Sequence, residues 1–115
     1  EELDVAAIGP GIESNTELFP NRTNVSFIAV DGSTVRARIF ERGVGETLSS
    51  GTGATGAAVA AVLRGVDSPV TVRLDGGELE VAVGEDMHID LTGWARPVYR
   101  ATLSDELLKE LDEVE

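Results

Sequence analysis

The chain has no cysteine, one histidine and one lysine among its 115 residues, and these absences exclude several classes of site. Because there is no thiol, the chain itself supplies no disulfide, no thiolate metal ligand and no cysteine nucleophile. The single histidine, His88, cannot bind zinc unless carboxylates supply the remaining ligands. Since the residues around His88 alternate as in a surface or edge strand, the sequence predicts no metal site.

Long apolar runs are also missing. The longest run, residues 57–63, is far shorter than the ~20 residues that a membrane-spanning helix needs. The chain opens without the basic and apolar segments of a secretion signal, so nothing in it directs export. We therefore expect a cytoplasmic protein with no membrane partner. Because the chain starts without methionine, inside a predicted strand, we also expect it to be part of a longer protein.

Basic residues are scarce relative to acidic ones. Lys plus Arg number 9 against 21 Asp plus Glu, which gives a net charge of −12 on 12.1 kDa. Nucleic acid is an unsuitable partner, because phosphate binding requires a basic face. Self-repulsion strains a compact state of this charge, and salt at 1 M screens it by shortening the Debye length to about 3 Å. The composition thus favours a salt-adapted protein; the alternative is an acidic domain with a charged tail, since residues 105–115 hold six of the acids.

Short alternating runs predict a mainly antiparallel sheet. Residues 3–8 are read as a strand that ends in a Gly-Pro-Gly turn. Residues 24–30 and 34–41 form a predicted β-hairpin, because Val35, Ala37 and Ile39 alternate with polar and aromatic residues. Hairpin-length turns separate further strands, which predicts antiparallel neighbours; these strands are residues 69–74, 78–84 and 87–93, followed by an extended run at 94–103.

Two segments have helical patterns. Residues 54–63 are apolar on every face, which is typical of a buried helix, and Gly65 is placed to end it in the left-handed conformation. Ser104 precedes an amphipathic C-terminal helix with leucines on one face. The predicted fold class is α+β, with a curved, mainly antiparallel sheet wrapped around one central apolar helix.

Three glycines at the start of the apolar helix raise the question of its ligand. Gly51, Gly53 and Gly56 match the G-x-G-x-x-G spacing of dinucleotide-binding folds. That interpretation is disfavoured, because a loop rather than a buried strand precedes the motif and the later turns are too short for parallel crossovers. A helix start nevertheless presents unpaired N–H groups to an anion, so a phosphate or a carboxylate remains a suitable ligand. A plain packing turn under the helix is the third alternative.

Three stretches resemble one enzyme family, the diaminopimelate epimerases. They are ERGVGETLSSGTGATGAAVAA at residues 41–61, IESNTELFPNRTNVSF at 12–27 and LTGWARPVYRATL at 91–103. The resemblance implies that residues 1–115 form one lobe, the C-terminal half of a two-lobe, cofactor-independent isomerase. In that family the active site lies between the lobes, and two bases move the α-proton of diaminopimelate, an intermediate of lysine biosynthesis. The implied partners are the amino-acid substrate and the N-terminal lobe, or a second copy of this chain.

The resemblance also implies the site residues. Asn24 matches a substrate-binding amide, Glu41 the carboxylate that accepts from the substrate ammonium, and Arg42 a carboxylate-binding guanidinium. Gly51 and Thr52 match the pair whose backbone N–H groups hold the α-carboxylate. No metal and no pyridoxal phosphate is implied. Glu46 is open to two interpretations, a substrate contact or a loop carboxylate.

Ser50 departs from the family pattern, because it stands where the catalytic cysteine is expected. A thiol has a reference pKa of about 8.5 and a helix N-terminus lowers it, whereas a serine hydroxyl is far less acidic. Ser50 is therefore expected to be a poor base. The cysteine has been replaced by engineering, or the other lobe's thiol sustains activity, or the protein runs a related reaction or only binds its ligand. A non-catalytic binding or assembly domain and a proline-racemase-like isomerase are accordingly alternatives.

Overall fold

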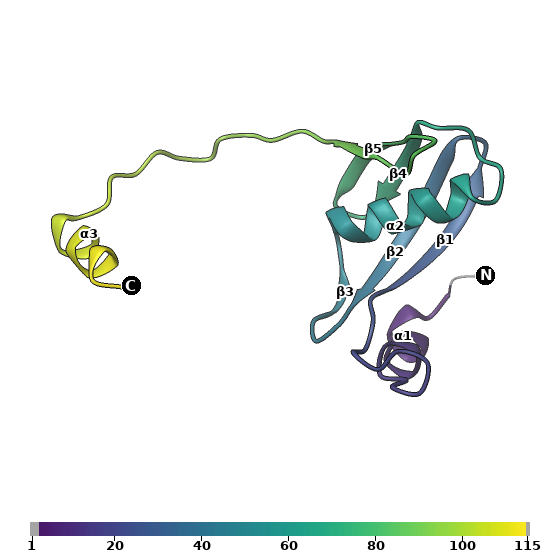
Figure 1. Ribbon diagram of the computed structural model, residues 1–115, viewed down its shortest axis with the longest axis horizontal. Helices are drawn as coiled ribbons and strands as arrows, with labels where there is room; N and C mark the ends of the chain where they lie inside the picture. The colour runs from purple at the N-terminus through teal and green to yellow at the C-terminus, as the bar shows by residue number, and fades with distance from the viewer. Residues whose placement is uncertain (1–2, 115) are drawn as a thin grey trace.

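The computed structural model describes residues 3–114, which form one body and a C-terminal arm (Figure 1). The overall extents are 53 × 33 × 31 Å. The helices are α1 (Val5–Glu13), α2 (Gly51–Val62) and α3 (Asp105–Asp112). The strands are β1 (Val25–Asp31), β2 (Thr34–Glu41), β3 (Gly45–Thr47), β4 (Val70–Leu74), β5 (Gly77–Val83) and β6 (Ile89–Thr92).

The six strands form one mixed sheet in the order β1-β2-β4-β5-β6, with β3 also paired to β2. Every neighbouring pair is antiparallel except β2 and β4, which are parallel and are joined through α2. The predicted hairpin is confirmed: Asp31 pairs with Thr34, so Gly32 and Ser33 alone make the turn. The predicted α+β class and the mainly antiparallel pairing are therefore confirmed.

The core lies between α2 and one face of the sheet. Val35, Ala37 and Ile39 are buried on that face, as their alternation predicts. The helix contributes alanines, whose small side chains let it approach the strands closely; the buried ones are Ala54, Ala57, Ala58 and Ala61. Because α2 contacts five of the strands, it is the central helix of the lobe.

The C-terminus of α2 has the hydrogen bonds of a Schellman motif. The Val66 N–H donates to the Ala61 carbonyl at 3.1 Å, and the Gly65 N–H donates to Val62 at 2.9 Å. Gly65 has φ +95°, a conformation that favours glycine. The predicted end of the helix is thus confirmed.

The strand predicted at residues 3–8 is wrong, because these residues begin helix α1. Asp4 caps it by accepting the Ala7 N–H at 3.0 Å. Val5, Gly9 and Glu13 are its buried residues, and their spacing of four is helical rather than extended. The Gly-Pro-Gly stretch suggested a turn, but Gly9 is needed for packing: a Cβ there would lie 2.5 Å from the Phe40 ring.

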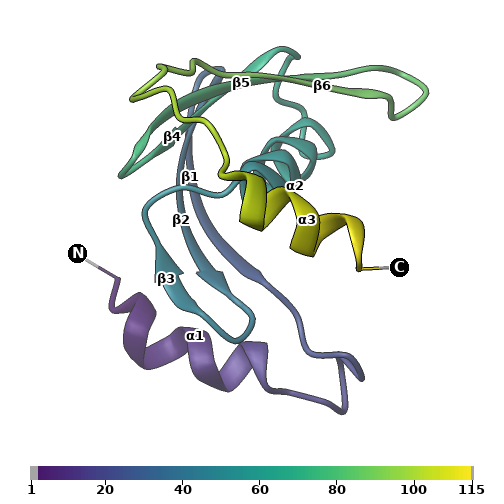
Figure 2. The ribbon, with the colours of Figure 1, turned by 90° about the vertical axis from the view of Figure 1, so that its left-hand side faces the viewer.

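Helices α1 and α2 cover opposite faces of the sheet (Figure 2). Phe40, which contacts α1, alternates along β2 with Ile39, which contacts α2. Arg36 and Arg38 therefore lie on the α1 face of β2, and a hollow of about 470 Å³ is lined by both.

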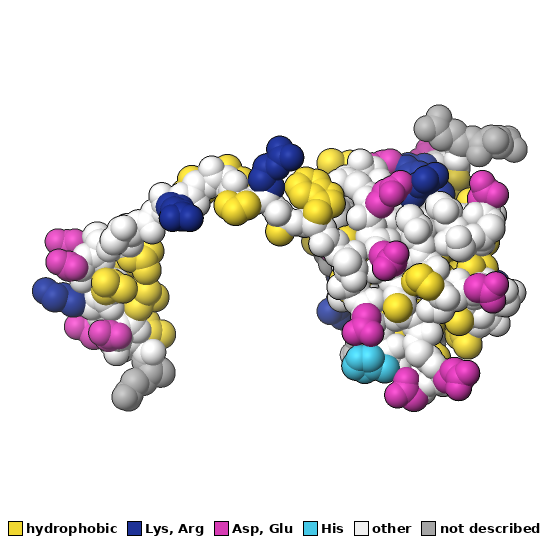
Figure 3. Space-filling model, turned by 90° about the horizontal axis from the view of Figure 1, so that it is seen from above, with side chains coloured by type: hydrophobic (Ala, Val, Ile, Leu, Met, Phe, Trp, Pro, Cys, Tyr) yellow, Lys and Arg dark blue, Asp and Glu magenta, His cyan; other side chains and the backbone are white. Residues whose placement is uncertain are grey.

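The C-terminal arm leaves the body after β6. Residues 93–104, which include the extended run predicted at 94–103, pair with no strand and lead to α3. The predicted terminal helix is confirmed, and Ser104 caps it by accepting the Leu107 N–H at 3.3 Å. Within residues 3–114, α3 contacts no other helix or strand. Its hydrophobic side chains gather on one side and its charged ones on the other (Figure 3).

None of the helices within residues 3–114 is both long and apolar enough to cross a membrane.

Candidate functional site at the start of helix α2

Helix α2 begins with two backbone N–H groups that lack acceptors within residues 3–114. Ser50 is the N-cap: its Oγ accepts the Gly53 N–H at 3.2 Å, and its carbonyl accepts the Ala54 N–H at 2.9 Å. These two bonds leave the N–H groups of Gly51 and Thr52 with no acceptor among residues 3–114. Both residues are exposed, and no acidic side chain lies in the first turn. The positive end of the helix dipole therefore faces outward, where an anion is stabilised.

Ser50 itself is buried, with 9% of its surface exposed. Its only hydrogen bond through Oγ, within the described chain, is the one from the Gly53 N–H. No carboxylate or imidazole bonds to this hydroxyl among residues 3–114, so no neighbouring base is placed to remove its proton. The geometry is that of a helix cap.

Asn24 and Arg42 come together at the end of the β1–β2 hairpin. The Arg42 backbone N–H donates to Asn24 Oδ1 at 2.8 Å, and Arg42 Nη1 donates to the Asn21 carbonyl at 2.7 Å. Because the Asn24 oxygen is already occupied, its NH₂ group is the part available to a ligand. Sequence patterning alone did not predict this contact, which spans 18 residues.

Glu41 is the last residue of β2 and is half-buried. Its Oε1 accepts a hydrogen bond from Thr47 Oγ1 at 3.1 Å across the β2–β3 hairpin. One carboxylate oxygen is thus held by the protein, and Oε2 has no hydrogen bond within residues 3–114. The β2–β3 hairpin therefore positions the carboxylate, and the chain continues from β3 into α2.

All the predicted site residues lie at one end of the sheet. Asn24 precedes β1, Glu41 ends β2, and the antiparallel register places these ends together. Ser26, on β1, donates from its Oγ to the Gly53 carbonyl at 3.4 Å, which ties this end of the hairpin to the first turn of α2. The structure therefore gathers the two groups of predicted residues, the hairpin end and the helix start, around the entry to α2.

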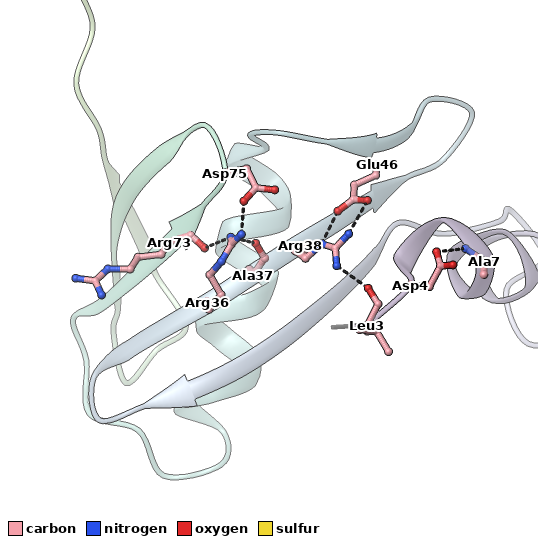
Figure 4. A network of polar contacts seen from close by, with 9 residues as sticks. All are labelled: Leu3, Asp4, Ala7, Arg36, Ala37, Arg38, Glu46, Arg73 and Asp75. Atoms are coloured by element: carbon pink, nitrogen blue, oxygen red, sulfur yellow. Dashed lines mark hydrogen bonds and ion pairs between the residues drawn. The ribbon is translucent and has the colours of Figure 1, made fainter. Parts of the chain in front are cut away.

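The structure also defines the surroundings of Glu46, His88 and Trp94. Glu46 lies on β3 and forms a bidentate pair with the Arg38 guanidinium, at 2.6 and 3.0 Å, so the expected loop carboxylate is instead a strand residue paired with a side chain (Figure 4). His88 is exposed, as predicted, with its Nε2 3.6 Å from an Asp90 carboxylate oxygen. Trp94 is largely exposed and borders a small hollow of about 160 Å³ beside the helix start.

That small hollow includes two glycines, Gly76 and Gly77, that sequence reasoning missed. Its lining contains Ser49, just before the helix cap, and Gly76 and Gly77 from the β4–β5 turn. The Asp-Gly-Gly sequence signalled only a tight turn between strands. Nothing in the sequence indicated that this turn, 25 residues further along, meets the start of α2.

Comparison with known proteins identifies the family. The model of the family described as diaminopimelate epimerase matches residues 1–98. A diaminopimelate epimerase of Ralstonia nicotianae is 45% identical over 113 residues, covering 96% of this chain and 38% of that protein. One from Cupriavidus metallidurans is 47% identical over 106 residues, covering 90% and 36%. One from Methanococcus maripaludis is 46% identical over 106 residues, covering 90% of this chain and 38% of that protein.

The matched region includes the strands, the central helix α2 and every predicted site residue. The chain spans less than two fifths of the length of these relatives. The matches extend over nearly the whole chain rather than over one motif. This chain belongs to the diaminopimelate epimerase family.

Proposed function

We propose that this chain is one lobe of an amino-acid epimerase, and that its α2 helix start holds the α-carboxylate of diaminopimelate while the stereocentre is inverted. The observation that carries the proposal is the pair of N–H groups of the exposed residues Gly51 and Thr52, which have no acceptor in the described part of the chain. Family membership supports the reaction class, since the relatives named above are diaminopimelate epimerases. The reaction interconverts the LL and meso forms by removing a proton from one face of the α-carbon and returning one to the other.

The hairpin residues have complementary roles in this proposal. The free carboxylate oxygen of Glu41 accepts from the substrate ammonium, and its neighbour Thr47 fixes its direction. Arg42 and the Asn24 NH₂ bind polar groups of the substrate, and the Arg42–Asn24 bond keeps the two together. A helix N-terminus stabilises the carboxylate and the additional negative charge that develops on it as the α-proton leaves. A protein that performs this step of lysine biosynthesis belongs in the cytoplasm.

Ser50 limits what this lobe contributes to proton transfer. Its hydroxyl is buried and accepts a hydrogen bond from Gly53, and no base adjoins it in the described chain. General acid–base catalysis is most efficient when the group's pKa lies near the working pH, which a serine hydroxyl does not approach. We propose that Ser50 preserves the helix cap and the substrate site, while proton transfer on this face is slow.

A partner lobe is the second part of the proposal. The predicted site residues all come from one end of this lobe, at the open end of the β1–β2 hairpin and the start of α2. The arm supports a partner as well: α3 exposes the apolar face formed by Leu107, Leu108 and Leu111 without covering any described element. We propose that the N-terminal lobe of the same protein completes the cleft, with a second copy of this chain as the alternative partner.

The test is exchange of the substrate's α-proton with deuterated solvent, followed by proton NMR. The 115-residue chain alone is expected to show no exchange, and rapid exchange by it would contradict the need for a second lobe. In the two-lobe protein, Ser50→Cys is expected to accelerate exchange strongly, because it supplies a thiol at the helix start. Ser50→Thr is the matched control, since it retains a hydroxyl and adds no thiol.

A non-catalytic binding domain is the second candidate function, and the buried, hydrogen-bonded Ser50 is the observation that favours it. This alternative predicts that diaminopimelate binds to the two-lobe protein with the same dissociation constant before and after Ser50→Cys, with no exchange in either case. Titration calorimetry and the exchange assay on the same samples separate the two functions.

A further inference from the structure

The segment that leads into α2 is held by the turn between β4 and β5. Residues 48–50 belong to no helix or strand, so their path depends on the contacts they make. The Gly76 N–H donates to the Leu48 carbonyl at 2.6 Å. Within residues 3–114, this is the only hydrogen bond that ties residues 48–50 to an element other than α2.

Only glycine fits at position 76. A Cβ there would lie 2.9 Å from the Leu48 carbonyl oxygen and 3.1 Å from Ser49 Cβ. The closest obstacle is backbone rather than the end of a flexible side chain, so an alanine would push the segment before the helix cap away. Gly76 thus makes both a short hydrogen bond and a close backbone approach to Leu48, which lies two residues before Ser50.

The turn is itself anchored from the sheet. Asp75 forms an ion pair with Arg36 of β2 (Figure 4). The same guanidinium donates from Nη1 to the Ala37 carbonyl at 2.9 Å and to the Arg73 carbonyl at 3.1 Å. Arg36 therefore connects β2, β4 and the turn through one rigid, planar group. The Arg73–Glu78 pair, at 2.6 Å, braces the two strands that the turn joins.

We infer that the Asp75–Gly76 turn, anchored by Arg36, is a positioning element for the start of α2. By holding the Leu48 carbonyl it sets the direction in which the chain enters the helix, and so aims the N–H groups of Gly51 and Thr52. These residues do not touch the substrate; they act through the helix start. The catalytic consequence rests on the proposed function, whereas the structural consequence does not.

The sharpest perturbation is Gly76→Ala. The matched control is Gly11→Ala, because a Cβ at Gly11 in α1 would meet no atom within 4 Å. In the 115-residue chain, ¹H–¹⁵N spectra of Gly76→Ala are expected to show shift changes at residues 48–53. The Gly53 amide, which donates to the Ser50 cap, is expected to exchange its hydrogen with solvent at least about tenfold faster. This factor corresponds to a loss of ~1.4 kcal/mol in the free energy that protects the amide. Gly11→Ala is expected to leave these amides unchanged.

The kinetic test uses the two-lobe protein. Since misplacement of a binding group by ~1 Å can cost about a hundredfold in rate, Gly76→Ala is expected to lower kcat/KM at least about tenfold, with a higher KM. Gly11→Ala is expected to stay within about twofold of the parent. A purely structural turn would lower stability without changing KM for the folded enzyme.

The outcomes separate this inference from the proposed function. Shift changes confined to residues 74–79, or an unchanged KM in a folded Gly76→Ala enzyme, would overturn the positioning role. If the parent two-lobe protein shows no exchange at all, the proposed function fails, and the amide spectra still decide the positioning role. If Gly76→Ala does not fold, Asp75→Asn decides: shift changes at Gly51 and Thr52 relative to the parent chain support the inference, and their absence would contradict it.

Discussion

Two glycines in α2, three residues apart, are expected to respond to alanine with opposite changes in stability. Gly53 faces the sheet: a Cβ there would lie 2.9 Å from Ile39 Cγ2 and 3.0 Å from its Cγ1 and Cδ1. Ile39 is fully buried, so its side chain has nowhere to move. Gly56 faces outward, and a Cβ there would meet no atom within 4 Å.

The expected magnitudes follow from packing and helix propensity. Carbon atoms in ordinary contact are about 3.5–4.0 Å apart, so Gly53→Ala forces α2 away from β2 by several tenths of an ångström. Overpacking of this kind costs roughly 1–3 kcal/mol, while alanine in place of glycine stabilises a helix by about 0.5–1 kcal/mol. Gly53→Ala is thus expected to lower the free energy of unfolding by roughly 0–2.5 kcal/mol, and Gly56→Ala to raise it by about 0.5–1 kcal/mol.

Urea unfolding of both variants and the parent chain, followed by far-UV circular dichroism, measures these differences. Because both substitutions replace glycine by alanine in one helix, their effects on the unfolded chain are nearly equal and cancel in the comparison. A Gly53→Ala variant as stable as Gly56→Ala would refute the reasoning, since it would mean that α2 does not rest on Ile39 at this distance. An m-value equal to that of the parent would verify that the transition remains comparable.

Three further perturbations test other parts of the structure. Ser50→Ala is expected to lower the unfolding free energy by about 1 kcal/mol through loss of the cap, whereas Ser50→Asp retains an acceptor; equal urea midpoints for all three chains would argue against the cap. Raising KCl from about 0.1 to 1 M is expected to raise the urea midpoint, because the Debye length falls from about 10 to 3 Å and the repulsion within a chain of net charge −12 is screened. The same rise in a chain of residues 1–104 would show that the acidic tail is not the source of the effect. Arg22→Ala is expected to lower the free energy of unfolding by about 1–3 kcal/mol, because it leaves the Glu13 carboxylate without its partner. That carboxylate belongs to a residue that is 3% exposed, and Arg22 bonds to it at 2.6 Å. A double-mutant cycle with Glu13→Gln that proves additive would contradict this coupling.

Local patterns predicted most of the body. The alternation of Val35, Ala37 and Ile39 placed β2 correctly, because a strand sends successive side chains to opposite faces. The all-round apolar character of residues 54–63 identified the central helix, and Ser104 marked the start of α3. Helix α1 was missed, because Gly-Pro-Gly is a strong local turn signal and only packing against Phe40 makes its small residues necessary.

The candidate site, like the body, was predictable from the sequence only in part. The helix start was predictable, since glycines and serines before an apolar helix indicate a cap with bare N–H groups nearby. Resemblance to a family added Asn24, Glu41 and Arg42, which composition and spacing did not single out. The Asn24–Arg42 bond and the Gly76–Leu48 bond depend on residues 18 and 28 positions apart in the chain.

The sequence by itself determined most of the strands and helices of the body, α1 excepted, and that α2 is an apolar, buried helix. These properties arise from neighbouring residues, through side-chain periodicity, capping and backbone freedom. Only the tertiary structure decided that β2 and β4 run parallel around α2 and that α1 covers the opposite face. It likewise decided that the Asp75–Gly76 turn meets Leu48, because such contacts require the whole sheet to assemble before the two segments come within hydrogen-bonding distance.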